Sequence, residues 1–124
     1  QEWEKAARGT DGRIWPWGND WDARRANTDD GGPGALTPIG SYPAGASPYG
    51  VQDMCGTVNE WCGHAPDAIQ QRSSPWGDVD RANTGYLSGG SWNDSPAVAR
   101  PAHRSQLFIG QTSDDIGMRL AKDA

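Results

Sequence analysis

The clearest alternation of apolar and polar positions lies in residues 116–121, IGMRLA, where Ile, Met and Leu occupy every second position. A period of two predicts a half-buried strand, because successive side chains of a strand point to opposite faces. Residues 85–92, GYLSGGSW, alternate well enough to predict another strand. In residues 49–63 the apolar positions are spaced less regularly, and the pattern favours a short helix or turn followed by a strand.

The start of the chain is predicted to be the end of a helix. Residues 1–8, QEWEKAAR, are good helix formers, and Gly9 stands where a C-terminal cap is expected. Residues 10–50 are punctuated by Gly, Pro, Asn and Asp and have little periodicity. We therefore expect ordered loops there, with short extended pieces such as residues 36–42.

Loops of this length need an anchor. Trp15, Trp17 and Trp21 supply one if their indoles are buried, and an ion held by backbone and side-chain oxygens is the alternative. A Pro-Trp-Gly motif, followed by acidic residues and Arg-Ala-Asn-Thr, occurs in residues 16–28 and again in 75–84. We interpret the two copies as similar turns, each with a tryptophan plug and an asparagine that caps its own backbone, rather than as two ligand sites.

The composition indicates one small, loop-rich domain. The sequence has 124 residues, with 17 glycines, 9 prolines and 7 tryptophans but only 35% hydrophobic residues, so turns and a few large indoles must organise it. The net charge is −5 and no basic run is present, which argues against a nucleic-acid partner. No apolar stretch has the length of a membrane span, so we expect no membrane insertion.

The two cysteines, Cys55 and Cys62, are too few for a disulfide scaffold, and no Cys/His cluster has zinc-finger spacing. Two half-buried thiols are the favoured interpretation. A disulfide between them is the alternative.

The segment 89–106, GGSWNDSPAVARPAHRSQ, combines a rigid frame with an unrelated assortment of side chains. Gly89 and Gly90 permit a tight backbone path, and Trp92 supplies buried area. Between these fixed points we expect the side chains to point outward and to form a contact surface of mixed polarity.

Three arginines are predicted to hold this segment in place. Arg100, Arg104 and Arg119 would pair with Asp114, Asp115 or backbone carbonyls. We favour such internal ties over ligand binding for all three arginines.

Several motifs are spread along the chain: 2-EWEKAARG-9, 15-WPWGNDWD-22, 25-RANT-28, 37-TPIGSYPAGASPYGVQDMCGTVNEW-61, 88-SGGSWNDSP-96 and 113-SDDIGMRLA-121. In this order they resemble one known family, the formylglycine-generating-enzyme (FGE) family, a branch of the C-type-lectin-like fold. The resemblance implies an α+β fold, rich in loops, with short antiparallel strands and few helices. It also implies that residues 1–124 are a single FGE-like domain without the N-terminal portion that family members usually carry.

The resemblance also bears on catalysis. In formylglycine-generating enzymes two cysteines five residues apart hold copper, and alignment on Gly-Gly-Ser-Trp puts those positions at Asp94 and Ala99. Neither side chain replaces a thiolate, so we expect no copper and a domain that is not an enzyme. A second branch, the iron-dependent sulfoxide synthases, carries its histidine ligands in a separate preceding domain.

A third branch is the most similar: the variable proteins of diversity-generating retroelements, in which miscopied adenines randomise chosen codons. The resemblance implies a ligand-binding display domain whose partner is a protein or glycan on a cell or virus surface, with the domain itself on a cell surface or virion. The predicted ligand-binding residues are Asn93, Asp94, Ser95, Ala97, Val98, His103, Ser105, Gln106, Leu107, Phe108 and Gln111. The alternatives are an FGE-like oxidase or related catalyst, or an accessory member of the family with an invariant surface.

Two of these residues, Leu107 and Phe108, also have a structural interpretation. Leu107, Phe108 and Ile109 form a short apolar run that in an ordinary domain belongs to the core. We expect Phe108 to be exposed, because the matching family positions lie on the ligand-facing side.

The resemblance further implies structural calcium. In residues 27–32 the side-chain oxygen of Asn27, the carbonyl of Thr28 and a carboxylate of Asp29 or Asp30 are the expected ligands. A second calcium site would use Glu60, but the surrounding motif reads GTVNEW and departs from the family pattern. The alternative for Glu60 is a charge paired with an arginine.

Overall fold

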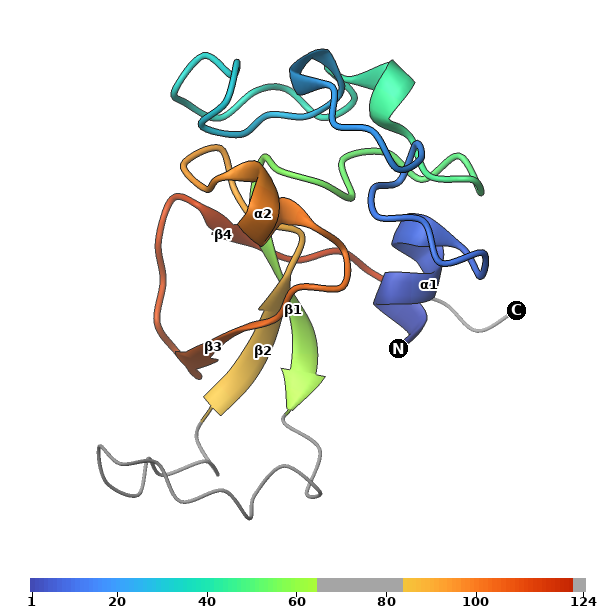
Figure 1. The fold of residues 1–124 in the computed structure, drawn as a ribbon. Helices are drawn as coiled ribbons and strands as arrows, with labels where there is room; N and C mark the ends of the chain where they lie inside the picture. Colours follow the sequence, from blue (N-terminus) through green and yellow to red (C-terminus); the bar gives the residue numbers. More distant parts are fainter. Residues whose placement is uncertain (65–83, 122–124) are drawn as a thin grey trace.

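The computed structural model of the chain describes residues 1–64 and 84–121. Short helices and a small sheet are joined by long loops (Figure 1). In chain order the elements are α1 (Glu2–Arg8), η1 (Ala23–Arg25), η2 (Pro43–Gly45), β1 (Asn59–His64), β2 (Thr84–Ser88), α2 (Pro96–Ala99), β3 (Ser105–Phe108) and β4 (Ile116–Gly117). The predicted α+β, loop-rich fold is therefore confirmed. None of the helices within these ranges has the length and apolar character needed to cross a bilayer.

The four strands form one mixed sheet in the order β3-β2-β1-β4. β2 pairs with β1 and β3 in the antiparallel direction, and β4 joins the other side of β1 in the parallel direction. Trp61 pairs with Leu87, and its ring covers Gly85, where an added Cβ would lie 2.8 Å from the indole. The strands predicted in 49–63 and 85–92 are thus confirmed, although the second ends before the Gly-Gly pair.

The C-terminal strand is much shorter than predicted. Only Ile116–Gly117 form β4, and the apolar residues that follow, Met118 and Leu120, are 76% and 91% exposed. Arg119, between them, turns inward because its guanidinium binds the Glu60 carboxylate. The ion pair directs the polar member of the alternation to the interior, so the prediction of a half-buried apolar face in this segment is wrong.

Residues 10–50 form a layer of loops over one end of the sheet (Figure 1). The extended piece predicted at 36–42 is instead a loop with a turn. The Gly40 N–H donates to the Asp53 carboxylate at 2.8 Å, so a side chain satisfies this backbone group in place of a neighbouring strand.

The three tryptophans of the loop layer pack together over the core. Trp15 is 6% exposed and belongs to a buried cluster of otherwise small residues, against which Trp17 and Trp21 also pack. The centroid of the Trp15 ring lies 6.0 Å from that of Trp17 and 4.7 Å from that of Trp21. Anchoring of the loops by a buried indole is therefore confirmed for Trp15, whereas Trp17 and Trp21 are only half-buried. The second copy of the Pro-Trp-Gly motif, at 75–84, lies outside the described residues except for Thr84.

The N-terminal helix ends where the sequence predicts and is tied to the rest of the domain by polar contacts. Gly9 has a φ of 71° and caps α1 by donating its N–H at 2.8 Å to the carbonyl four residues earlier. The Trp3 indole N–H donates to Glu60 at 2.7 Å, and Glu4 forms an ion pair with Arg104 at 2.7 Å. Contacts distant in sequence thus fix α1 against the sheet.

Candidate functional site

The segment after β2 follows a path that requires glycine. Gly89 and Gly90 have φ angles of 97° and 66°, values that other residues rarely adopt. A Cβ on Gly90 would lie 2.6 Å from the Cα of Ala99, so the loop and α2 approach each other closely. The backbone N–H of the half-buried Trp92 donates to the Thr57 carbonyl at 3.1 Å. These contacts support the rigid frame expected from the sequence.

Asp94 holds the segment from the inside. Its Oδ2 accepts from Asn59 Nδ2 at 2.8 Å and from the N–H and hydroxyl of Ser91 at 2.9 and 2.8 Å. Its backbone carbonyl accepts from the Asp29 N–H at 3.1 Å. We expected this side chain to face a ligand, but it turns inward because the buried amide and hydroxyl groups need an acceptor. The Ser-x-x-Asp spacing, which suits a local turn, was the sequence signal for this role.

The other predicted ligand-binding residues differ in exposure. The exposed ones are Asn93, Ala97, Gln106, Phe108 and Gln111. The half-buried ones are Ser95, Val98, His103, Ser105 and Leu107. Because Phe108 is 49% exposed, the expectation that it faces solvent rather than the core is confirmed.

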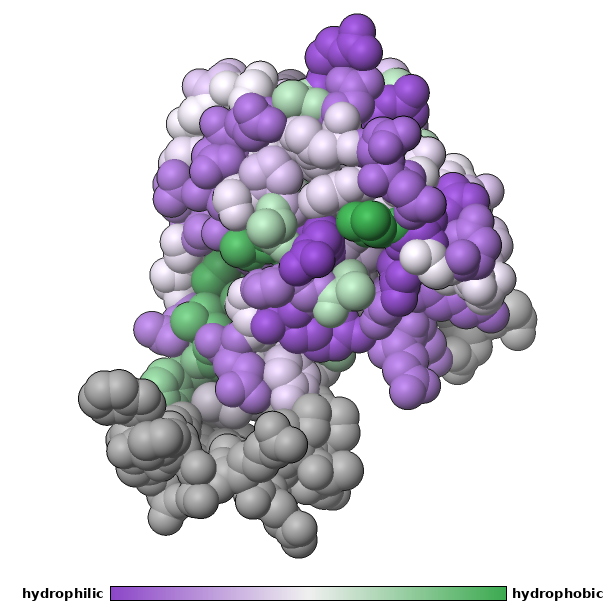
Figure 2. All heavy atoms as spheres, in the orientation of Figure 1, coloured by the Kyte–Doolittle hydropathy of each residue, from purple (hydrophilic) through white to green (hydrophobic). Residues whose placement is uncertain are grey.

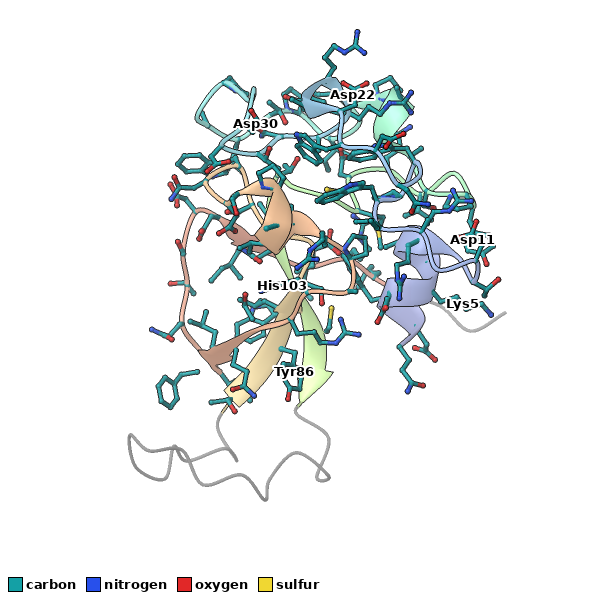
Figure 3. All side chains as sticks on the ribbon, in the orientation of Figure 1. Lys5, Asp11, Asp22, Asp30, Tyr86 and His103 are labelled. Carbon is teal, nitrogen blue, oxygen red and sulfur yellow. The ribbon has the colours of Figure 1, made fainter. Side chains whose placement is uncertain are left out.

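These residues lie in two groups, which we call together the candidate ligand face (residues 93–98 and 103–111). One group surrounds α2, next to the loop layer, and the other lies on β3 and the loop after it. Figure 3 shows His103 between α2 and β3. In Figure 2 apolar side chains gather in a narrow strip beside β3, whereas the rest of the visible face is mainly hydrophilic. The face therefore offers a mixed surface, as recognition surfaces do.

The three arginines form internal ties, but not with the predicted aspartates. Arg100, which directly follows α2, donates from Nε to the carbonyl of Ala97 within that helix at 2.9 Å. Arg104 pairs with Glu4 and donates to the Ser88 hydroxyl at 3.2 Å. Pairing of the arginines with Asp114 or Asp115 was therefore wrong, because glutamates on α1 and β1 lie within reach instead. Pairing with backbone carbonyls is confirmed for Arg100 and for Arg119.

The third arginine, Arg119, forms the most buried ion pair in the described part of the chain. Its Nε and Nη2 each lie 2.6 Å from an oxygen of Glu60, and Nη2 also donates to the carbonyls of Gln52 and Asp53. The Glu60 side chain is only 5% exposed. The hydrogen bond to Glu60 raises the pKa of Arg119.

The predicted calcium loop contains an oxygen without a partner. Asn27 is fully buried, and its Nδ2 donates to the Ala35 carbonyl at 3.0 Å and to Thr37 at 3.2 Å. Its Oδ1 has no hydrogen-bond partner. A Cβ built on Gly32 would lie 2.5 Å from both this oxygen and the Thr28 carbonyl. Two of the expected ligands thus converge beside a residue that leaves room for them, and the donor set fits a hard cation.

The carboxylates of the same loop lie closer to solvent than Asn27 and Thr28 do. Asp29 and Asp30 are both exposed, and Asp30 Oδ2 accepts from the Trp21 indole N–H at 2.7 Å. Calcium at these residues remains a prediction. At the second predicted site, Glu60 already accepts from Trp3 and Arg119, so its predicted pairing with an arginine is confirmed. A calcium role for Glu60 remains a prediction as well.

Both cysteines are free thiols, as the favoured interpretation expected, but Cys55 is buried in the core rather than half-buried. Burial raises the pKa of Cys55 to about 12, which makes it unreactive at neutral pH. Cys62 is half-buried, and burial raises its pKa too. Within the described ranges, no three His, Cys, Asp or Glu side chains form a group that could hold a metal ion.

The whole chain, residues 1–124, matches the family described as the sulfatase-modifying factor enzyme 1-like domain, or FGE-sulfatase. The chain belongs to the FGE-sulfatase family. The FGE-sulfatase domain is 32% identical over 139 residues to a hercynine oxygenase of Mycolicibacterium smegmatis and 34% identical over 135 residues to one of Mycobacterium tuberculosis. Each alignment covers 98% of this chain but only 32% and 31% of the relative. The chain therefore spans about a third of the length of these relatives.

Solved structures agree with the predicted fold. PvdO from Pseudomonas aeruginosa superposes with a TM-score of 0.73 and 27% identity, over 94% of this chain and 48% of that one. Treponema denticola variable protein 1 superposes with a TM-score of 0.68 and 23% identity, over 94% and 43%. The FGE-sulfatase domain thus has the FGE-like, C-type-lectin-like fold, and the predicted family is confirmed.

The expectation that the domain is not an enzyme is wrong. The hercynine oxygenases that match nearly all of it are enzymes by name. The expectation rested on Asp94 and Ala99 standing where copper-binding cysteines would be. That replacement removes the thiolates of one branch of the family and leaves the chemistry of other branches open.

Proposed function

We propose that this FGE-sulfatase domain is part of an oxygenase related to the hercynine oxygenases and that it contributes a face that contacts the substrate. The observation that carries the proposal is an identity of 32–34% with these enzymes along 98% of the chain. Since the chain spans about a third of their length, the full-length polypeptide is the proposed catalyst.

The proposed role of this domain is substrate positioning. The candidate ligand face carries the exposed Phe108 at the end of β3 and the half-buried His103 before that strand, an aromatic ring and an imidazole that can each contact part of a substrate. Asp94 and the close contact of Gly90 with Ala99 fix the backbone beneath part of this face. A fixed backbone suits such a task, because little loop entropy is lost when the ligand binds. In the sulfoxide synthases, which this family includes, the iron-binding histidines lie in a preceding domain, so we assign no redox ligand to the described residues.

The test is an oxygen-consumption assay of the full-length polypeptide with iron(II), hercynine and a panel of small thiols, since a sulfoxide product needs a sulfur donor. Products are identified by mass spectrometry. We expect turnover, and we expect His103→Ala and Phe108→Ala each to raise KM by about tenfold or more. Tyr49→Ala, which changes an aromatic side chain that is 57% exposed and outside the face, is the control and should leave KM unchanged. Absence of oxygen uptake with every thiol would refute the proposal.

A finer hypothesis concerns the same face: its side chains are diversified by a retroelement and bind a protein or glycan on a cell or virus surface. Its support is that the exposed residues Asn93, Ala97, Gln106 and Gln111 lie on a backbone fixed by other residues. Sequencing of several isolates, together with the flanking DNA, tests it. We expect substitutions confined to the candidate ligand face, and an invariant face would contradict the hypothesis.

We also propose that residues 27–32 bind calcium through Asn27, Thr28 and Asp29 or Asp30. The support is the buried, unpartnered Asn27 oxygen. Isothermal titration of the chelator-treated protein with calcium should show one site, and calcium should raise Tm. The variant Asn27→Leu should lose both effects, whereas Asn19→Leu, at an exposed loop position, should keep them.

A further inference from the structure

Trp17 and Trp21 each keep part of their ring surface exposed to solvent. They pack against the buried Trp15 cluster, yet both remain half-exposed. Beside them lies a groove of about 570 Å³, lined by the continuous segment of residues 17–25. Ligand sites in proteins commonly enclose about 300–1,000 Å³. The groove is therefore large enough for a small molecule or for a few units of a linear polymer.

The two indoles are held in fixed orientations. The Trp17 N–H donates to the Asp20 carbonyl at 2.9 Å, and the Trp21 N–H donates to the Asp30 carboxylate at 2.7 Å. The ring centroids lie 5.6 Å apart, and the ring planes are inclined by 46°. Because both N–H groups are already bonded within the protein, the rings have only their apolar surfaces to offer a ligand. Fixed rings lose no rotamer entropy on binding.

The charges of the groove balance. Its lining contains two aspartates, Asp20 and Asp22, and two arginines, Arg24 and Arg25, so the formal charge is zero. Asp22 is shared by both arginines, at 2.9 Å from Arg24 Nε and 3.3 Å from Arg25 Nε. The net charge of the lining therefore favours a strongly charged ligand of neither sign. Instead the rim offers polar groups: the exposed carboxylate of Asp20 and the guanidinium of Arg24, which is 90% exposed.

We propose that this groove binds a neutral oligosaccharide. The C–H-rich face of a pyranose ring is weakly positive and flat, and it suits the electron-rich face of an indole. Sugar hydroxyls at the ring edge both donate and accept, and the Asp20 carboxylate and Arg24 guanidinium supply an acceptor and a donor beside the indoles. A cationic ligand would also favour indole faces, but the lining has no net negative charge to attract it.

The groove is distinct from the candidate ligand face. Figure 3 shows Asp22 and Asp30 in the loop layer, whereas His103 lies beyond α2, toward the sheet. The proposal therefore concerns a second site and does not depend on the oxygenase function. A binding measurement without turnover can test it separately.

The experiment is isothermal titration of the full-length polypeptide with cellohexaose, maltohexaose and N-acetylchitohexaose, with choline chloride and an oligogalacturonate as cationic and anionic comparisons. We expect at least one neutral oligosaccharide to bind with a Kd on the order of 1 mM or lower. Trp21→Ala should weaken that binding by about tenfold or more. The matched control is Tyr49→Ala, an exposed aromatic residue outside the groove, which should bind normally.

Because Trp21 packs against the core, Trp21→Ala can also unfold the loop, so two surface variants accompany it. Asp20→Ala and Arg24→Ala alter exposed side chains and should each weaken binding by several-fold without changing Tm. The proposal is overturned if no neutral oligosaccharide binds, if only choline or the oligogalacturonate binds, or if binding is unaffected by these surface variants.

Discussion

Arg119 donates two hydrogen bonds of 2.6 Å to the Glu60 carboxylate, although the two residues are 59 positions apart in the sequence. The same carboxylate accepts from the Trp3 indole at 2.7 Å. One buried charge thus joins α1, β1 and the segment after β4. Because the Glu60 side chain is only 5% exposed, an unpaired charge here would be costly.

The first prediction follows from this pair. Glu60→Gln should lower the free energy of unfolding by about 3 kcal/mol, because it leaves the Arg119 guanidinium half-buried without a counter-charge. Chemical denaturation measures the loss. Arg24→Gln, which breaks an ion pair on an exposed side chain, is the control and should change stability little. Equal effects of the two variants would contradict the importance assigned to burial.

The second prediction concerns Gly90. An added Cβ at Gly90 would meet the Ala99 backbone at 2.6 Å, whereas at Gly12, with a similar φ of 79°, nothing lies within 4 Å. Gly12→Ala therefore carries only the conformational cost, about 1 kcal/mol, and Gly90→Ala should cost about 1–3 kcal/mol more. Thermal unfolding of both variants separates the two contributions. If they lose the same stability, the close approach to Ala99 is not real.

The third prediction concerns Thr57, which has a φ of 70° and a buried hydroxyl without a partner. Asparagine tolerates this backbone region better than a β-branched residue does, so Thr57→Asn should raise the free energy of unfolding by about 1 kcal/mol. Thr57→Val is the control: it removes the hydroxyl but keeps the branched Cβ, so the backbone strain at this position stays. Relief of strain therefore adds nothing to the stability of Thr57→Val. A denaturation midpoint for Thr57→Asn below that of the natural chain would argue against strain at this position.

The fourth prediction concerns pH. Burial by itself would raise the pKa of Glu4, but the hydrogen bonds from Arg8 and Arg104 outweigh it and lower the pKa below its ordinary value of 4.5. The folded protein then binds this proton less readily than the unfolded chain. The contribution of Glu4 is complete above the ordinary value and is lost as pH falls through the lower, folded value.

The measurement is Tm between about pH 6 and pH 3 for the natural chain and for Glu4→Gln. The natural chain should lose more stability than the variant over this range, because the variant has no carboxyl group to protonate at position 4. Other carboxylates titrate in both proteins and cancel in the comparison. Parallel curves would show that Glu4 contributes nothing to acid sensitivity.

Much of the local structure could be predicted from the sequence. The cap at Gly9, the tryptophan anchors and the Gly-Gly turn each depend on residues within a few positions of one another, so short motifs carry their signal. Exposure of Phe108 followed from the family resemblance rather than from its apolar neighbours. The calcium loop was named from its motif, and its unpartnered Asn27 oxygen agrees with that hypothesis without testing it.

The contacts that hold the parts together could not be predicted in this way. Arg104 pairs with Glu4 across 100 residues, and Asp94 accepts from Asn59 across 35. No periodicity in the sequence specifies such partners. The inward turn of Asp94 results from its contact with Asn59. The exposure of Met118 results from another such contact, the Arg119–Glu60 ion pair. The oligosaccharide groove was also missed, because its tryptophans were assigned wholly to the core.

The position of β4 has a consequence for how the chain reaches its native state. β1 is complete at His64, but its parallel partner begins only at Ile116, so the register Asn59–Ile116 closes a loop of more than 50 residues. Pairings of such long range form slowly, because a large loss of chain entropy precedes them. On the ribosome, β1 therefore lacks its β4 partner until the Ile116 segment has emerged. Until then the unpaired edge of β1 is exposed to strand pairing with a neighbouring nascent chain.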